Sequence, residues 1–384
     1  MKIGIDIRNI GKGRTGDEVV FFNLVKTLAK TDNLNEYRLF TDITDEKKLE
    51  EIGTSLGLAE NETFEIISLK AKNKFDWNRN VISEWLAKHP VDVYHTQYIT
   101  PFKFPVNIKL VTTIHDVSFR AYPGMIKFFD LLFLRLLIPK SLKRANLIIA
   151  VSEFTKNEII KYYKVDPAKI EVVYNAVDDD FLKNKELNDS PFATSVIEKY
   201  SLPEKFIMYL GTLQPRKNLP VLIKAYAKIK EKLPDIKLLL CGKKDAHNVD
   251  FQIDSLVQHF SFQKDVLFSG FIKDVEKPAF YKSAQAFCFP SFYEGFGIPL
   301  LEAMSENVPV LASDIPAHRE IGGDAVLYFD PKSPDNLSEK IETILTQPEM
   351  REELIKKGQK RLENFSWEKS TQKLLGLYQK MLTK

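Results

Sequence analysis

The chain has 384 residues and a formal net charge of +3, with 44% hydrophobic and 28% charged residues. One hydrophobic core seldom grows beyond about 250–300 residues, so two domains are expected. This composition excludes a disordered or fibrous protein, and so small a net charge gives no reason to expect a nucleic-acid partner.

The N-terminus, MKIGIDIRNI, lacks the long apolar core and the cleavage site of a signal peptide. No segment reaches the roughly 20 consecutive apolar residues that a membrane-spanning helix needs. We therefore expect a cytoplasmic protein. Cys241 and Cys288 lie within apolar runs, where free thiols behave as small buried hydrophobes, so neither a disulfide nor a zinc site is expected.

Short apolar runs alternate with longer amphipathic stretches along the first half of the chain. Strands that are apolar on both faces and alternate with helices are typical of parallel sheets built from βαβ units. These runs are KIGIDI, YRLFT, FEIIS, VDVYHT, KLVTTIH, NLIIAVS and EVVYNAV.

A glycine-rich loop, GKGRTG at 11–16, follows the first of these runs and precedes a helix predicted over Val19–Leu28. The loop matches neither the GxGxxG fingerprint nor the GxxxxGK[ST] phosphate loop. The sequence therefore supports neither classical dinucleotide binding nor P-loop chemistry.

His115 and Asp116 follow the fifth run. Open parallel sheets bind ligands beyond the carboxyl ends of their strands, so His115 could donate a hydrogen bond to a reacting oxygen or bind substrate. A lone histidine is more often simply packed or solvated, and both interpretations stay open.

The stretch IKFFDLLFLRLLIPKSLKRA, at 126–145, carries five basic residues and one acidic residue. A basic amphipathic helix can lie on an anionic membrane leaflet. Apolar residues surround this predicted helix almost completely, however, which favours burial in the first domain. We expect burial and keep peripheral contact with an anionic membrane as the alternative hypothesis.

A polar stretch poor in strand formers, DDDFLKNKELNDSPFATSV, begins at Asp178. It predicts a domain boundary near residues 176–200. Asp178–Asp180 has the look of an acidic metal-binding run, but a solvated turn is the simpler interpretation in a linker. The six histidines form no HExxH pattern, and we predict no metal site.

The second half repeats the plan with FIMYLG, IKLLLCG, DVLFSGF, AFCFP, PVLAS and AVLYF, and a helix is predicted over Leu219–Leu233. Arg216 and Lys217 lie between the first run and this helix. A guanidinium fork beside an ammonium group, before a helix N-terminus, can hold a phosphate. A solvated basic turn is the alternative for such a pair taken alone.

Glu294 and Glu302 flank a glycine-rich turn in SFYEGFGIPLLEAM, after the run AFCFP. The glycines permit close backbone approach, so amides near Gly297 could face a diphosphate while the carboxylates accept hydrogen bonds from hydroxyls. Pro299 suits the first turn of a helix that contains Glu302. Glu302 could instead only complement the dipole of that helix.

A terminal helix is predicted over Trp367–Leu382. Its apolar stripe needs a partner surface, and the first domain is one candidate. The stripe consists of Leu374, Leu375, Tyr378, Met381 and Leu382.

Together these motifs resemble the retaining glycosyltransferases of family 4 over essentially the whole chain. The resemblance rests on the Glu-x7-Glu signature from Glu294 to Glu302, the segments GTLQPRKNLPVLIKAY and VPVLASDIPAHREIGGDAVLYFDP beside it, and TIHDVSF, ANLIIAVSEFTKNEI and FSWEKSTQKLLGLY elsewhere. It implies an α/β protein of the GT-B fold, with two Rossmann-like domains facing across a cleft. We expect an acceptor domain at 1–180, a nucleotide-sugar domain at 201–365 and a helix at 366–384 that returns to the first domain.

The resemblance also implies roles for individual residues. Arg216 and Lys217 would bind the donor diphosphate, Glu294 the hydroxyls of the transferred sugar, and Glu302 the nucleotide ribose. The implied catalytic residues are His115, Arg216, Lys217 and Glu294. The other implied donor-binding residues are Gly16, Gly270, Phe271, Ile272, Gly295, Phe296, Gly297, Ile298 and Glu302.

The chain departs from the family at the first glycine loop. Family members often have TGIGRY there, whereas this chain has TGDEVV, so Gly16 matches the first glycine and Glu18 replaces the second. A carboxylate beside a diphosphate would be repelled. Either Glu18 turns elsewhere, for example to the acceptor, or phosphate contact is lost here.

We therefore expect a retaining, metal-independent hexosyltransferase that requires no cofactor. It would move a hexose, with mannose from GDP-mannose favoured, to a glycan or lipid-linked acceptor in cell-surface polysaccharide synthesis. A nucleotide-sugar 2-epimerase of the same fold is the main alternative, and a non-catalytic sugar-binding protein is a third.

Overall fold

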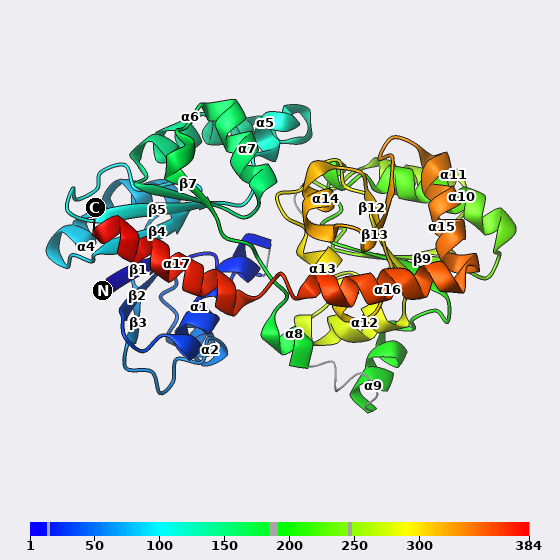
Figure 1. Ribbon diagram of the computed structural model, residues 1–384, viewed down its shortest axis with the longest axis horizontal. Coiled ribbons are helices and arrows are strands. Elements are labelled where there is room, and N and C mark those ends of the chain that lie inside the picture. The colour runs from blue at the N-terminus through cyan, green and yellow to red at the C-terminus, as the bar shows by residue number, and fades with distance from the viewer. Residues whose placement is uncertain (14–15, 184–190, 245–247, 384) are drawn as a thin grey trace. The chain divides into compact units, whose positions relative to one another are not determined.

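The structure is a computed structural model that describes residues 1–13, 16–183, 191–244 and 248–383. It divides into two compact units, each with its own parallel sheet (Figure 1). The first unit comprises residues 1–120, 128–175 and 366–384, and the second comprises 121–127 and 176–365. No sequence pattern predicts that Ala121–Lys127 groups with the second unit.

The first sheet has seven strands in the order β3-β2-β1-β4-β5-β6-β7. All neighbours are parallel, and β1 pairs on both sides, with Ile3 opposite Tyr37 and opposite Val93. The chain order reverses between β1 and β4, where open α/β sheets place their ligands. The strands are β1 (Lys2–Asp6), β2 (Glu36–Thr41), β3 (Phe64–Ser68), β4 (Val93–Gln97), β5 (Lys109–Ile114), β6 (Leu147–Ala150) and β7 (Ile170–Val172).

The second sheet has six parallel strands in the order β10-β9-β8-β11-β12-β13. Its order reverses between β8 and β11. Every apolar run expected to be a strand forms one, which confirms the predicted α/β fold class. The strands are β8 (Phe206–Leu210), β9 (Lys237–Cys241), β10 (Val266–Phe268), β11 (Ala286–Phe289), β12 (Val310–Ser313) and β13 (Val326–Phe329).

Helices connect the strands in both units. In the first unit and its connections they are α1 (Gly16–Thr31), α2 (Glu46–Ser55), α3 (Lys74–Asp76), α4 (Ile82–Lys88), α5 (Ser118–Ala121), α6 (Phe128–Arg144), α7 (Glu153–Tyr163) and α17 (Trp367–Leu382). In the second unit they are α8 (Asp179–Lys183), α9 (Pro191–Tyr200), α10 (Leu219–Lys232), α11 (Gln252–His259), α12 (Lys277–Ser283), α13 (Ile298–Ser305), α14 (Pro316–Gly322), α15 (Pro334–Thr346) and α16 (Pro348–Leu362).

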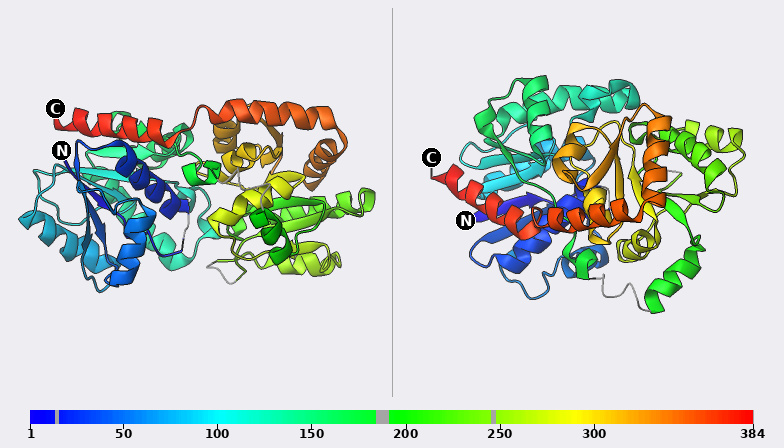
Figure 2. Two further views of the ribbon diagram at one scale, coloured as in Figure 1. Left: turned by 90° about the horizontal axis from the view of Figure 1, so that it is seen from below. Right: turned by 45° about the vertical axis from the view of Figure 1, so that its right-hand side comes forward.

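Helix α17 has the bounds predicted for the terminal helix and packs against α1 in the first unit (Figure 2, left). Leu374 and Tyr378 of its apolar stripe are fully buried. The Tyr378 hydroxyl lies 2.6 Å from Nδ1 of His95, whose Nε2 lies 2.7 Å from Oγ1 of Thr113. Burial lowers the pKa of His95 to about 3, so the ring stays neutral and these hydroxyls satisfy both nitrogens.

We expect Tyr378→Phe to lower the free energy of unfolding by about 1–2 kcal/mol, because a nitrogen of the buried His95 ring loses its partner. Urea unfolding followed by circular dichroism measures this change. Tyr162→Phe alters a half-buried ring on α7 and should leave the unfolding curve in place. Equal curves for wild type and Tyr378→Phe would contradict the expected role of this hydrogen bond.

The prediction that the helix within 126–145 is buried is wrong for one side of α6. Ile138 and Leu142 are buried, but Phe128 and Phe129 are 70% and 82% exposed. A helix that covers a sheet buries only one side, so apolar residues all round it cannot all be covered. Within the residues that the structure describes, no helix is long and apolar enough to cross a membrane.

Candidate active site

Two loops of the second unit meet at the point where the strand order of its sheet reverses. Residues 211–218 follow β8 and residues 290–297 follow β11, and these two strands are paired neighbours. The amide of Phe292 donates to the carbonyl of Arg216 at 2.9 Å. The sequence predicted ligand-binding residues on two separate loops, and the structure places these loops in contact.

Asn218 holds three segments together at this junction. Its backbone is left-handed, with φ of +56°, a conformation that Asn tolerates better than most residues. Its side-chain amide donates to the carbonyls of Pro290 at 3.1 Å and Pro331 at 2.8 Å. Sequence analysis missed this role, although an Asn between a basic turn and a helix is itself a signal for a left-handed residue.

Arg216 and Lys217 converge on one carboxylate. Lys217 Nζ lies 2.5 Å from Oε1 of Glu294, and Arg216 donates to Oε2 at 3.3 Å. Ser291 adds a hydrogen bond of 2.6 Å to Oε1. Lys217, Glu294 and Ser291 are buried, so the predicted phosphate-binding pair and the predicted sugar-binding carboxylate form one cluster.

The electrostatics of this cluster favour an anion. Burial alone would raise the pKa of Glu294, but Lys217 and Arg216 outweigh it and hold the pKa at about 2. The carboxylate is therefore ionised at neutral pH and lies beside two cationic side chains. Cationic side chains in a poorly solvated loop junction are a good environment for phosphate oxygens.

Glu302 lies in the middle of α13 and is also held from the side. The hydroxyl of Tyr281 donates to its Oε2 at 2.8 Å, and Nζ of Lys277 lies 3.3 Å from its Oε1. The alternative that Glu302 only complements a helix dipole from the first turn is wrong, because α13 begins at Ile298 and has no acidic residue in its first turn. Both partners come from α12, where their spacing of four places them on one face.

The glycine turn between the two glutamates leads directly into α13. Gly297 has φ of +107° and precedes the helix, and Pro299 lies in the first turn as predicted. The ring of Phe296 packs edge-on against Phe365 and is 4% exposed. The side chain of Phe296 therefore belongs to the packing of the second unit.

The loop Gly270–Ile272 follows β10, an edge strand of the same sheet. Gly270 has φ of +71°, which favours glycine. The ring of Phe271 is 48% exposed with Nζ of Lys243 at 5.0 Å from its centre, whereas Ile272 is buried. An exposed ring beside a cation suits the stacking of a nucleobase.

His115 lies in the first unit at the end of β5 and is 7% exposed. Its Nε2 donates to Oε1 of Gln97 at 2.8 Å, and its ring contacts that of Tyr98. Tyr98 has φ of +54°, a strained conformation that tends to occur at functional sites. With Nε2 engaged, a neutral ring offers Nδ1 as an acceptor, and only the doubly protonated ring donates through it.

The structure shows where the side chain of Glu18 points in the first glycine loop. Helix α1 begins at Gly16, and the buried Glu18 accepts a hydrogen bond of 2.8 Å from the amide of Gly11. Its carboxylate therefore ties the loop back onto itself. Arg14 and Thr15 lie outside the described residues.

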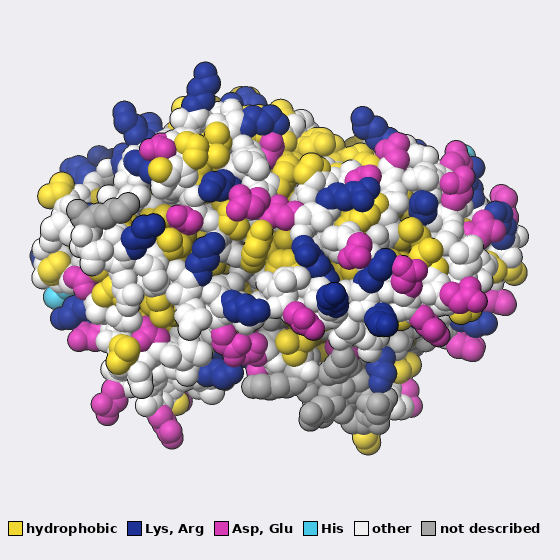
Figure 3. Space-filling view, viewed as in Figure 1, with side chains coloured by type: hydrophobic (Ala, Val, Ile, Leu, Met, Phe, Trp, Pro, Cys, Tyr) yellow, Lys and Arg dark blue, Asp and Glu magenta, His cyan; other side chains and the backbone are white. Residues whose placement is uncertain are grey.

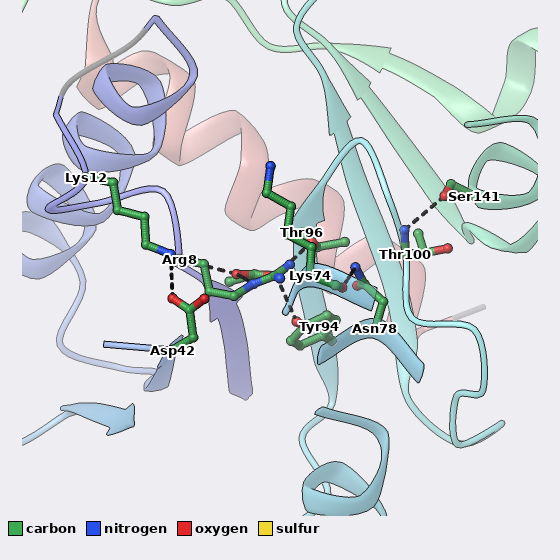
Figure 4. A network of polar contacts seen from close by, with 10 residues as sticks. Arg8, Lys12, Asp42, Lys74, Asn78, Tyr94, Thr96, Thr100 and Ser141 are labelled. Atoms are coloured by element: carbon green, nitrogen blue, oxygen red, sulfur yellow. Dashed lines mark hydrogen bonds and ion pairs between the residues drawn. The ribbon is translucent and has the colours of Figure 1, made fainter. Parts of the chain in front are cut away.

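A second polar network, which sequence analysis missed, lies where the strand order of the first sheet reverses (Figure 4). Arg8 donates to both oxygens of Asp6, at 2.9 and 2.7 Å, and Thr96 donates to Oδ2 at 3.1 Å. The guanidinium also lies 4.5 Å from the ring centre of Trp77. The signal in the sequence was an Asp at the end of β1 with an Arg two residues later.

The Asp178–Asp180 run forms the start of α8, where Asp178 accepts from the amide of Asp180 at 2.9 Å. This is the geometry of a helix cap. Among the described residues, no group of three or more His, Cys, Asp or Glu side chains could hold a metal ion.

Two units, each with a parallel sheet whose strand order reverses once, form the architecture of the GT-B fold. A solved glycosyltransferase from Rickettsia africae ESF-5 shares the fold with a TM-score of 0.75 at 21% identity, over 99% of this chain and 98% of that one.

The family follows from the sequence comparisons. The model described as Glycosyltransferase Family 4 matches residues 14–181, and the model described as Glycosyl transferases group 1 matches residues 195–361. The O-antigen chain mannosyltransferase B of Escherichia coli is 32% identical over 70% of both chains. The O-antigen chain mannosyltransferase RfbU of Salmonella typhimurium is 26% identical over 90% of this chain and 91% of its own. The chain belongs to glycosyltransferase family 4, which confirms the resemblance found in its sequence.

Proposed function

We propose that this glycosyltransferase transfers mannose from GDP-mannose, with retention and without a metal ion, to a hydroxyl of a glycan or glycolipid acceptor. The similarity to two O-antigen chain mannosyltransferases supports the sugar and the setting of cell-surface polysaccharide synthesis. Nucleotide sugars are made in the cytoplasm, so we place the reaction at the inner face of the cell membrane.

The observation that carries this proposal is the cluster of Arg216, Lys217 and Glu294, with two cations and one carboxylate. We propose that the donor diphosphate takes over both cations. Glu294 is then released from them and accepts hydrogen bonds from hydroxyls of the bound sugar. The cluster thus exchanges its two internal ion pairs for contacts to the donor.

The chemistry needs no nucleophile from the protein. The acceptor hydroxyl attacks the anomeric carbon from the face that the diphosphate is leaving. As the new C–O bond forms, the bond from carbon to the phosphate oxygen breaks, and that phosphate takes the acceptor proton. Arg216, Lys217 and the first amides of α13 stabilise the negative charge that develops on the diphosphate.

The remaining proposed donor contacts come mainly from the loops around the Arg216–Lys217–Glu294 cluster. We propose that Glu302, held by Tyr281 and Lys277, accepts hydrogen bonds from the ribose, and that the loop Gly270–Ile272 lies against the base. Gly295–Ile298 would offer backbone amides to the sugar and phosphates. In the first unit, His115 would lie beside the donor sugar and Gly16 beside the diphosphate.

A thermal-shift panel of GDP-, UDP- and dTDP-sugars, each with and without EDTA, tests the donor and the metal independence. We expect GDP-mannose to raise the melting temperature most, and EDTA to leave that shift unchanged. A larger rise in melting temperature with a UDP- or dTDP-sugar would show that the donor carries that nucleotide instead of GDP. A shift that disappears with EDTA would overturn the proposed mechanism.

The epimerase alternative gains no support from the family models or the named relatives. Incubation of the protein with GDP-mannose and no acceptor separates the two activities. A transferase hydrolyses the donor slowly at most, whereas an epimerase changes the configuration of the sugar while the nucleotide stays attached.

A further inference from the structure

Helix α6 presents a row of large apolar side chains to solvent. Its five exposed members, here called the outer α6 face, are Phe128 (70% exposed), Phe129 (82%), Leu132 (45%), Phe133 (38%) and Leu136 (55%). Scattered exposed apolar residues are ordinary on a protein surface, but a contiguous patch marks a site of interaction.

The spacing of these five residues puts them on one side of the helix. At 100° per residue they fall within an arc of about 140°. Ile138 and Leu142 fall outside this arc and are buried, and α6 packs on β5 of the first unit. The helix is therefore anchored along its inner side, and the outer side is not needed for that packing.

Basic side chains accompany the outer α6 face. Lys140 and Lys143 are exposed and lie within the same arc, one to two turns beyond Leu136. Lys127, Arg135 and Arg144 are also exposed, and Asp130 is the one acidic residue in this stretch. Figure 3 shows hydrophobic side chains interspersed with Lys and Arg over α6.

We infer that the outer α6 face docks on the surface of an anionic lipid bilayer, with the helix axis parallel to the membrane plane. Aromatic rings and leucines would enter the boundary between headgroups and acyl chains. The long lysine and arginine side chains would reach the anionic headgroups. This inference deepens the proposed function, because it places the enzyme where a lipid-linked acceptor would be found.

Charge favours a bilayer over a second copy of this chain as the occupant. A symmetric pairing through the outer α6 face would bring the same basic side chains of both copies together, and like charges across an interface oppose association. An anionic leaflet matches both the apolar row and the positive charge.

Vesicle flotation tests this inference. We expect the protein to float with phosphatidylcholine vesicles that contain 30% phosphatidylglycerol, and to bind pure phosphatidylcholine far less. Phe128→Ser/Phe129→Ser should weaken binding at least about tenfold. Lys140→Gln/Lys143→Gln should weaken it mainly at 50 mM salt, because 500 mM salt already screens the headgroups.

The matched control is Leu34→Ser/Phe251→Ser, which removes two apolar side chains that are 89% and 81% exposed elsewhere on the surface. This variant should float like wild type. If it loses as much binding as the α6 variant, or if wild type ignores anionic vesicles, the inference is overturned. If light scattering shows that wild type is a dimer and Phe128→Ser/Phe129→Ser is a monomer, the outer α6 face mediates self-association and the inference is overturned.

Donor stabilisation separates this test from the proposed function. The α6 variants should keep the thermal shift with nucleotide sugar, since the outer α6 face is not part of the donor cluster. Loss of vesicle binding with an intact donor shift supports docking. Absence of any donor shift in wild type would contradict the proposed function, whatever the vesicles show.

Discussion

Lys217→Ala should lower kcat/KM for glycosyl transfer at least about tenfold, which corresponds to ~1.4 kcal/mol of lost transition-state stabilisation. Lys217 is proposed to lie on the diphosphate as negative charge develops there, and a preorganised cation in a poorly solvated site contributes most at that moment. Steady-state kinetics with the donor identified by the thermal-shift panel measures the change.

The structure adds a second consequence of Lys217→Ala. Glu294 would keep the 3.3 Å contact to Arg216 and the hydrogen bond from Ser291 but lose its nearer cation, so a buried carboxylate would lose much of its compensation. The variant should therefore also unfold at a lower urea concentration. Kinetics must be measured at a temperature at which circular dichroism shows the variant to be folded, so that lost activity is not lost structure.

Lys228→Ala provides the control for this experiment. Lys228 belongs to the next helix, α10, and forms an exposed ion pair of 2.6 Å with Asp335. Its removal should leave kcat/KM and the unfolding curve as in wild type, because exposed pairs contribute little. If Lys217→Ala matches wild type in kcat/KM while Lys228→Ala does too, Lys217 does not bind the diphosphate.

Hydrophobic patterning was sufficient to predict the sheets. Most strands are short runs buried on both faces, such as FIMYLG or LIIAVS, and such runs differ clearly from the amphipathic helices between them. The bounds of α17 were likewise predictable, because Ser366 caps its first turn and the apolar stripe has helical spacing.

The pairing of side chains across loops could not be predicted in the same way. Glu294 and Lys217 are 77 positions apart and meet only because β8 and β11 are neighbours. Tyr281 and Glu302 likewise meet only in the folded chain, because β11 separates their helices along the sequence. Sequence motifs indicated Lys217, Glu294 and Glu302, but not Tyr281, and only the fold brings these residues into contact.

The α6 error has a related cause. An apolar helix is expected to be buried because its own periodicity offers no polar side to solvent. How much of it is covered depends on the surface it lies on, and that surface is a property of the fold. Ile138 and Leu142 are buried, whereas Phe129 and Leu132 are exposed to solvent.

Glu294→Gln should lower the free energy of unfolding by roughly 3 kcal/mol at pH 7. Despite burial, Lys217 and Arg216 lower the pKa of Glu294 from its ordinary value of 4.5 to about 2, and each pKa unit corresponds to about 1.4 kcal/mol. The glutamine has nearly the same shape, so the loss comes from the charge that it cannot supply to the buried Lys217.

The sign of the shift fixes the pH dependence. Because the folded-state pKa is depressed, the stabilisation by Glu294 is complete above pH 4.5 and is lost as the pH falls from there to about 2. The difference between wild type and Glu294→Gln, from urea unfolding, should thus be constant between pH 7 and pH 5 and shrink below pH 4.5. Burial lowers the pKa of His318 to about 4, and the charge of Glu294 acts against this lowering, so Glu294→Gln also alters the titration of His318.

Glu342→Gln is the matched control, since Glu342 forms an ion pair of the same 2.5 Å length with Lys232 but on the surface. Its removal should cost less than about 1 kcal/mol. Equal costs for the two variants would show that burial adds nothing to the Glu294 pair. A cost for Glu294→Gln that does not shrink below pH 4.5, or that grows as the pH falls from 7 to 5, would show that the folded-state pKa of Glu294 is not lowered, and that Lys217 and Arg216 do not hold its carboxylate as the structure indicates.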